Sequence, residues 1–97
     1  MSRATIITEP SERITSNILT KYEVSSILAS RAKEIENGSP YDPRLIDELN
    51  ELNLEITNIH LAELELKYGL IPYYIYRTIG DGVYERWKIS EMYYRSD

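Results

Sequence analysis

The sequence predicts an α+β fold: a small helical domain of two main helices, followed by a C-terminal β-hairpin and preceded by an extended N-terminal arm. Three observations support this prediction. Residues 20–37 have the apolar spacing and the terminal residues of a capped α-helix. Residues 43–68 repeat apolar side chains at alternating spacings of four and three. Residues 71–90 change to a spacing of two around a glycine-rich turn.

The composition limits the protein to one small core. The chain has 97 residues, so we expect residues 1–19 to form the arm and residues 20–97 to form a single domain. The 42% of apolar residues includes nine tyrosines, and the chain has no phenylalanine. Because a tyrosine has a polar end that often stays in water, this composition predicts a thin core. The chain has no cysteine, which excludes disulfides and thiolate metal sites.

The net charge of −5 arises in one central segment. Residues 42–66 contain seven acids and a single base, Arg44. This balance disfavours a general nucleic-acid binder, which needs a basic surface to contact phosphates. The sequence shows no apolar run of about 20 residues and no signal peptide. We therefore expect a soluble chain without membrane contact, located in the cytoplasm, with a virion or the nucleus as alternatives.

The helix over 20–37 has clear ends but one misplaced charge. Thr20 with Glu23 three positions later predicts a capping box, and Asn37 with Gly38 predicts the C-terminal cap. Arg31 lies in the middle of the apolar stripe of this helix. A guanidinium in that position needs a partner, from this chain or from another.

The helix over 43–68 follows Asp42, a predicted N-cap, and could continue unbroken to Gly69 or break near Asn53 or Asn58. Four of its acids lie off the apolar seam and are expected on a solvated face: Asp47, Glu48, Glu51 and Glu55. The seam has the heptad pattern of a coiled coil and consists of Leu45, Leu49, Leu52, Ile56, Ile59, Glu63 and Leu66.

The hairpin over 71–90 is expected to turn through a three-residue loop, Gly80-Asp81-Gly82, because a two-residue turn would place Arg77 opposite Arg86. This register predicts that charge reversal at both Arg77 and Glu85 restores the stability lost at either one. The predicted opposing pairs are Ile79 with Val83, Arg77 with Glu85, Ile75 with Trp87, and Tyr73 with Ile89.

Catalytic patterns are missing from the sequence. The Gly80-Asp81-Gly82 segment joins two strands and does not open a helix, so it is not a phosphate-binding loop. Serine, histidine and aspartate have no triad spacing, and the single histidine, His60, is expected to be structural. We expect no catalytic, cofactor-binding or metal-binding residue.

An ordered set of short motifs resembles the omega-type small subunit of multisubunit RNA polymerases, and within it the archaeal subunit K and the common sixth subunit of eukaryotic polymerases. The set covers about 80 residues, and its members keep the order of the family. They are T-K-Y-E at 20–23, R-A at 31–32, G-S-P at 38–40, E-L at 65–66, I-P at 71–72, Arg77, D-G-V-Y-E at 81–85 and Trp87.

The resemblance implies a noncatalytic subunit that clasps the largest polymerase subunit and promotes assembly of the enzyme. Its partners would be that subunit and the assembled core, with nucleic acid contacted only through the complex, no cofactor and no homo-oligomer. The candidate protein-binding residues are those of the shared motifs: Lys21, Tyr22, Arg31, Ile71, Pro72, Arg77 and Trp87. For Ile71, Pro72, Ile75 and Trp87 a place in the core is favoured over a contact with the partner.

For Arg31 the resemblance favours a head group that crosses the subunit boundary. The alternative is an internal pair with an acid or carbonyl of the chain's own C-terminal segment. The sequence also departs from the family at three points. Glu34 replaces a frequent glutamine, the linker between Pro40 and Glu65 is longer than usual, and the acidic N-terminal tail of eukaryotic members is missing. The last favours an archaeal or viral member.

Two other functions compete with this interpretation. One is a coiled-coil adaptor that dimerises through the seam at 45–66, against which Glu63 on the seam argues. The other is a small single-stranded nucleic-acid-binding module that uses the tyrosines and basic residues on the outer face of the hairpin.

Overall fold

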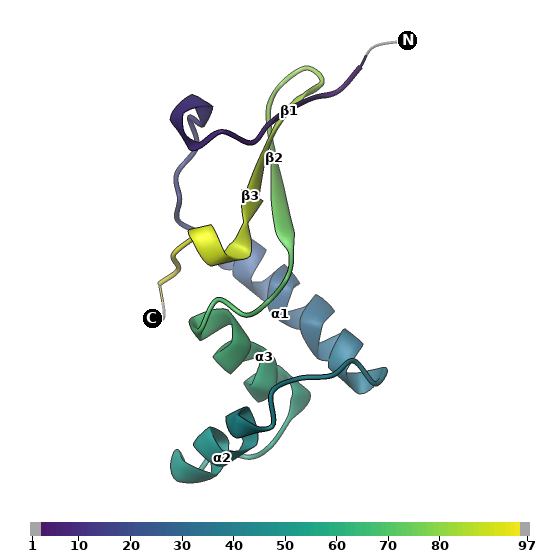
Figure 1. Ribbon diagram of the computed structural model, residues 1–97, viewed down its shortest axis with the longest axis vertical. Coiled ribbons are helices and arrows are strands. Elements are labelled where there is room, and N and C mark those ends of the chain that lie inside the picture. The colour runs from purple at the N-terminus through teal and green to yellow at the C-terminus, as the bar shows by residue number, and fades with distance from the viewer. Residues whose placement is uncertain (1–2, 96–97) are drawn as a thin grey trace.

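The computed structural model describes residues 3–95 and confirms the α+β fold class. The sheet and the group of helices lie end to end, so the molecule is elongated, with extents of 50 × 27 × 20 Å. The sheet lies at one end and the helices at the other (Figure 1). In chain order the elements are β1 (Thr5–Ile7), a 3-10 helix (Pro10–Glu12), α1 (Lys21–Glu36), α2 (Arg44–Glu51), α3 (Asn58–Lys67), β2 (Tyr74–Gly80), β3 (Val83–Lys88) and a second 3-10 helix (Ile89–Glu91).

Helix α1 has the ends that its sequence predicts. The Glu23 N–H donates to Thr20 Oγ1 at 3.0 Å, and the Thr20 N–H donates to Glu23 Oε1 at 2.9 Å, which completes the capping box. At the other end Gly38 has φ +99°, a left-handed conformation that glycine adopts without steric cost. The predicted helix over 20–37 is therefore confirmed.

Residues 43–68 form two helices, so of the two possibilities that the sequence left open, the break near Asn53 is the one that forms. Asn53 takes a left-handed conformation with φ +56°, and the Leu54 N–H closes the end of α2 by donating to Leu49 O at 2.9 Å. Thr57 then caps α3 by accepting a hydrogen bond from the His60 N–H at 3.1 Å. Asparagine tolerates the left-handed region and threonine satisfies a helix start, so two local signals override the heptad pattern.

The break also divides the predicted coiled-coil seam. Leu45, Leu49 and Leu66 of that seam are buried, whereas Leu52, Ile56 and Ile59 are exposed. The seam therefore does not form one continuous apolar surface, and the structural basis of the coiled-coil alternative is lost.

The left-handed conformation at Asn53 leads to a test of the helix break. Asn53→Val is expected to lower the free energy of unfolding by about 1 to 2 kcal/mol, because a β-branched residue is strained at positive φ. Asn53→Gly is expected to keep or slightly raise it. Urea unfolding of the variants measures the difference, with Asn37→Val as the control, since Asn37 has φ −86°. Equal losses at the two positions would contradict the assignment.

The sheet has the order β1-β3-β2, with β3 in the centre. Strands β2 and β3 form the antiparallel hairpin, and β1 runs parallel to β3 with Thr5 opposite Val83 and Ile7 opposite Glu85. The arm that was predicted as extended supplies this strand, and its residues 10–12 form a 3-10 helix (Figure 1). Residues 1 and 2 of the predicted arm lie outside the described residues.

The predicted hairpin register is confirmed over most of its length. Ile75 pairs with Trp87 and Arg77 with Glu85, and the Ile89 N–H donates to Tyr73 O at 3.0 Å. The prediction is wrong at the turn, where Gly80 rather than Ile79 pairs with Val83. The chain turns through Asp81 and Gly82, and a bulge between Thr78 and Gly80 absorbs the extra residue, so the pairs beyond it keep their register.

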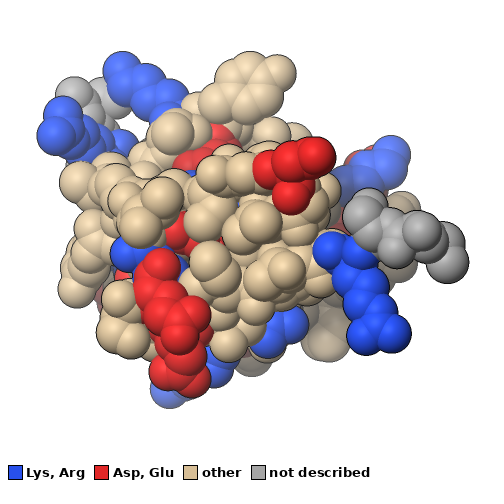
Figure 2. All heavy atoms as spheres, turned by 90° about the horizontal axis from the view of Figure 1, so that it is seen from above, with Lys and Arg blue, Asp and Glu red and all other residues tan. Residues whose placement is uncertain are grey.

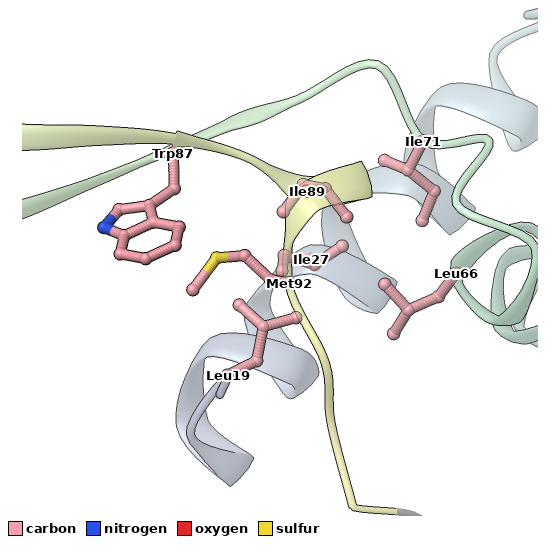
Figure 3. Packing of buried hydrophobic residues seen from close by; sticks show 7 residues of the cluster. All are labelled: Leu19, Ile27, Leu66, Ile71, Trp87, Ile89 and Met92. Carbon is pink, nitrogen blue, oxygen red and sulfur yellow. The ribbon is translucent and has the colours of Figure 1, made fainter. Parts of the chain in front are cut away.

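Two separate apolar clusters hold the elements together. The larger joins the helices to the sheet, and its side chains from α1, α3 and the end of the hairpin point toward one another (Figure 3). It consists of Leu19, Ile27, Leu66, Ile71, Trp87, Ile89 and Met92. The smaller lies among α1, α2 and α3 and consists of Ile35, Leu45, Leu49, Leu61 and Leu64. Helix α2 therefore rests on a core of its own.

Candidate protein-binding site

The seven candidate protein-binding residues divide by exposure. Lys21, Tyr22 and Pro72 are exposed, and the Tyr22 side chain is 85% accessible to solvent. Ile71 and Trp87 belong to the larger apolar cluster, Arg31 is buried, and Arg77 is half-buried. Three of these side chains are thus exposed, and the other four make contacts inside the chain.

The expectation that Arg31 pairs across a subunit boundary is corrected by the structure, because its partner is Glu65 of α3. Nε donates to Glu65 Oε1 at 2.7 Å, and an Nη donates to Oε2 at 2.9 Å. The same nitrogen also donates to Pro40 O at 2.9 Å. Arg31 is 7% exposed and Glu65 is 4% exposed, so this is a buried two-point ion pair. The internal alternative expected a partner in the C-terminal segment, whereas the carboxylate that binds Arg31 belongs to α3.

The hydrogen bonds that Arg31 donates to Glu65 are the main reason that the pKa of Arg31 lies above its usual value, against the effect of burial. Glu34 sits beside this pair, with Oε1 at 3.5 Å from the guanidinium, and it accepts a hydrogen bond from the Tyr73 hydroxyl. Burial and then this contact raise the pKa of Tyr73 to about 12. Glu34, which stands where the resemblance expects a glutamine, therefore contacts both Arg31 and Tyr73.

Glu85 fastens the N-terminal arm to the sheet. Its fully buried carboxylate accepts hydrogen bonds from the Ile14 N–H at 2.5 Å, the Thr15 N–H at 3.2 Å and the Thr15 hydroxyl. The Trp87 indole N–H donates to it at 2.9 Å. Burial alone would raise the pKa of Glu85, but these hydrogen bonds outweigh it and lower the pKa to about 2. Glu85 is therefore ionised at neutral pH, and the arm supplies most of its partners.

Arg77 holds the following part of the arm. It donates to Glu23 at 2.8 and 3.1 Å, to Thr15 Oγ1 at 3.1 Å and to Ile18 O at 3.0 Å. The hydrogen bond from Arg77 is the main cause that lowers the pKa of Glu23. Arg77 and Glu85 face each other in the register and both bind Thr15, but Arg77 forms its ion pair with Glu23, so the expected rescue by charge reversal at both positions does not follow.

Arg13 is a functional part of this arrangement that sequence reasoning missed. Its guanidinium donates to Glu91 at 2.9 Å and to Arg86 O at 2.9 Å, and it stacks on the Trp87 ring at 4.2 Å from the centroid. Nothing in the local sequence marks Arg13, because its acid lies 78 residues away. We call Arg13, Arg77 and Glu85 the arm clamp.

The exposed candidates adjoin shallow hollows that a partner could fill. One hollow lies beside Lys21 at the start of α1 and is lined by Ile18, Leu19, Val24, Ser25 and Arg95. Two others adjoin at the outer face of the hairpin, where they share Tyr74, Lys88 and Ser90, and one of them contains Pro72. Arg86 stacks over Tyr74 there at 4.8 Å.

The sheet end of the molecule has few charges at its centre. Seen from above, the face is mostly uncharged, with lysines and arginines projecting at its edge and a few acids between them (Figure 2). A face with few charges at its centre and charges around it suits protein contacts. Between residues 3 and 95 there is no cluster of three or more histidines or acids able to hold a metal ion. In the same range no helix is both long and apolar enough to cross a membrane.

No family model matches the chain. Comparison with known proteins nevertheless identifies relatives over most of its length. It is 34% identical over 82 residues to a probable DNA-directed RNA polymerases I, II, and III subunit RPABC2 of Caenorhabditis elegans, a match that covers 84% of this chain and 55% of the relative. The chain is a homologue of the RPABC2 polymerase subunits. A match of this length must run through all three helices and β2.

Two further relatives agree with this assignment. A DNA-directed RNA polymerases II and V subunit 6B of Arabidopsis thaliana is 36% identical over 88% of this chain and 56% of its own length. The RPABC2 subunit of Schizosaccharomyces pombe is 33% identical over 84% of this chain and 52% of its own length. The chain therefore spans about half the length of the RPABC2 relatives that it matches. These relatives are eukaryotic and do not support the expected archaeal or viral origin.

Proposed function

We propose that the chain is a noncatalytic subunit of a DNA-directed RNA polymerase that clasps the largest subunit and promotes assembly of the enzyme. The observation that carries the proposal is the identity of 33 to 36% to proteins named as polymerase subunits over more than 80% of this chain. It works with that transcription machinery, in the nucleus or the cytoplasm, and meets nucleic acid only through the complex. The nucleic-acid-binding alternative has no support from these relatives.

The proposed mechanism is stabilisation by selective binding. A subunit that binds only the folded form of the largest subunit shifts its equilibrium toward that form by mass action. If it joins segments that are distant in the sequence, it also removes loop entropy before the rest of the large subunit folds. The arm clamp supports this role because it fixes the arm, and with it the exposed residues beside the arm, before the partner binds.

Within this proposal Lys21, Tyr22 and Pro72 contact the partner directly. Tyr22 is an exposed aromatic residue on a helix whose position is fixed by its capping box, which is the usual setting of an interface anchor. Arg31, Ile71, Arg77 and Trp87 contribute by shaping the surface from within the chain.

The proposal is tested by purifying the tagged chain from its native source. We expect the large polymerase subunits in stoichiometric amounts and no turnover by the isolated chain. Tyr22→Ala combined with Lys21→Glu is expected to weaken this association about tenfold or more while the melting temperature of the isolated chain changes little. Lys33→Glu, an equal charge reversal on the same helix, is the control. Recovery of the unmodified chain as a lone monomer at low salt would overturn the proposal.

A further inference from the structure

The connection between α2 and α3 exposes a group of large apolar side chains. Leu52, Leu54, Ile56 and Ile59 are 52%, 44%, 47% and 39% accessible to solvent, all within eight consecutive residues. Residues 54–57 belong to no helix or strand, and both Leu54 and Ile56 are exposed there. We call residues 52–59 the apolar turn. It lies at the helical end of the molecule, away from the turn of the hairpin (Figure 1).

The backbone of the apolar turn is fixed at both ends. The Leu52 N–H donates to Glu48 O at 3.0 Å, and the left-handed Asn53 directs the chain out of α2. Toward α3, Thr57 caps the helix and a ring nitrogen of His60 hydrogen-bonds to Glu55 O at 2.6 Å. The chain therefore holds these apolar side chains in solvent by specific contacts. Such an ordered exposed patch is typical of an interaction site.

The charge around the apolar turn has one sign. Residues 45–66 contain no lysine or arginine. Asp47, Glu51 and Glu55 are exposed and form no ion pair with any residue between 3 and 95. The cations nearest in sequence are engaged already, since Arg44 binds Asp42 at 2.6 Å and Lys67 lies 4.0 Å from Glu48.

We propose that the apolar turn with its acids is a docking surface for a basic amphipathic segment of a partner protein. Apolar side chains of such a segment would cover the leucines and isoleucines, and its lysines or arginines would face the free carboxylates. Nucleic acid and an anionic membrane surface are repelled by this charge. A second copy of the chain would bring like charges together, because a two-fold contact places the same patch on itself. This surface is additional to the one proposed for the polymerase clasp.

A defined probe tests the chemistry of the surface. The probe is an 18-residue amphipathic helical peptide with leucines at helical spacing on one face and lysines on the other. The control peptide has glutamate in place of every lysine. In spectra of the isotopically labelled full chain, we expect the lysine peptide to shift amide signals of residues 47–60 and the glutamate peptide to leave them in place. Binding is expected to weaken as salt is raised.

Paired variants separate this surface from general attraction to an acidic protein. Leu54→Ser with Ile56→Ser is expected to weaken binding of the lysine peptide about tenfold, a change of about 1.4 kcal/mol. Ile14→Ser, at another exposed isoleucine, is the control. Glu51→Lys with Glu55→Lys is expected to have a similar effect, whereas Glu9→Lys with Glu12→Lys, of equal charge, is expected to have little.

Crosslinking identifies the natural occupant. A photoreactive residue at position 54 of the full chain, in the complex purified from its native source, is expected to crosslink to a protein segment rich in lysine or arginine with apolar residues at helical spacing. A crosslink to a second copy of the chain, to nucleic acid or to an acidic segment, or no crosslink at all, would overturn the proposal. So would equal binding of the two peptides, or shifts outside residues 47–60. Polymerase association that survives Leu54→Ser with Ile56→Ser separates this surface from the proposed clasp.

Discussion

Arg31→Ala is expected to lower the free energy of unfolding of the isolated chain by about 3 to 5 kcal/mol, because it leaves the buried carboxylate of Glu65 without its cation. The loss includes the bond to Pro40 O, which ties the end of α1 to the following loop. Chemical unfolding followed by circular dichroism measures it. Arg31→Lys should recover only part of the loss, since a single ammonium cannot reproduce the two-point contact with Glu65.

A double substitution separates the loss of the charge pair from the loss of packing. Arg31→Met with Glu65→Leu is expected to recover most of the stability lost in Arg31→Ala, because no buried charge remains unpaired. Arg44→Ala is the control, since Arg44 and Asp42 form their ion pair in solvent and its removal should change little. If Arg31→Ala keeps the unfolding midpoint but loses polymerase association, the guanidinium acts mainly across the subunit boundary.

Glu85→Gln is expected to destabilise the chain by about 3 kcal/mol, because an amide cannot accept all the hydrogen bonds that converge on the buried carboxylate. Loss of the Glu85 carboxylate should release the arm first, since Ile14 and Thr15 supply most of those hydrogen bonds. Hydrogen exchange at these two amides is expected to become fast at neutral pH. Protection equal to that of the unmodified chain would contradict the role of Glu85 in the arm clamp.

The same carboxylate makes stability depend on acid. Its pKa in the folded chain is about 2, below the ordinary value of 4.5, so it contributes its full stabilisation above pH 4.5 and loses it as the pH falls toward 2. The lowering of the Glu85 pKa corresponds to about 3 kcal/mol in the free energy of unfolding at neutral pH. The difference in stability between the unmodified chain and Glu85→Gln should therefore shrink across this window. Glu36→Gln, at an exposed acid of α1, is the control for the substitution itself.

Local signals in the sequence predicted the parts of the fold that local contacts determine. The capping box at Thr20 and Glu23 involves residues three positions apart, so α1 could be placed without knowledge of the rest of the chain. The hairpin register followed from the opposing side chains around one turn. The bulge beside Gly80 was missed, because a loop and a bulge satisfy the same pairs farther along the strands.

The helix break shows a different limit. A repeat with spacings of four and three is satisfied by one straight helix and equally by two helices whose apolar faces meet, as Leu49 and Leu61 do in the smaller cluster. Asn53 and Thr57 decide between them through backbone conformation and capping. Tertiary packing rather than periodicity determines which arrangement forms.

The contacts that the candidate site residues make inside the chain could not be predicted from the sequence. The motif positions were identified from resemblance, yet the partner of Arg31 is 34 residues away and Arg77 reaches Glu23 across 54. No single-sequence pattern encodes these distances. Leu52, Ile56 and Ile59 were assigned to an apolar seam, so their exposure became visible only with the fold.

The pairing of β1 with β3 has a consequence for the order in which the chain folds. The strand at Thr5–Ile7 has its partners at 83–85, and Asn17 and Leu19 exchange backbone hydrogen bonds with Tyr93. During synthesis α1, α2 and α3 are complete before any of these partners emerges from the ribosome. The first residues to be made are therefore the last to find their place, and closure of this long loop is expected to limit the folding rate.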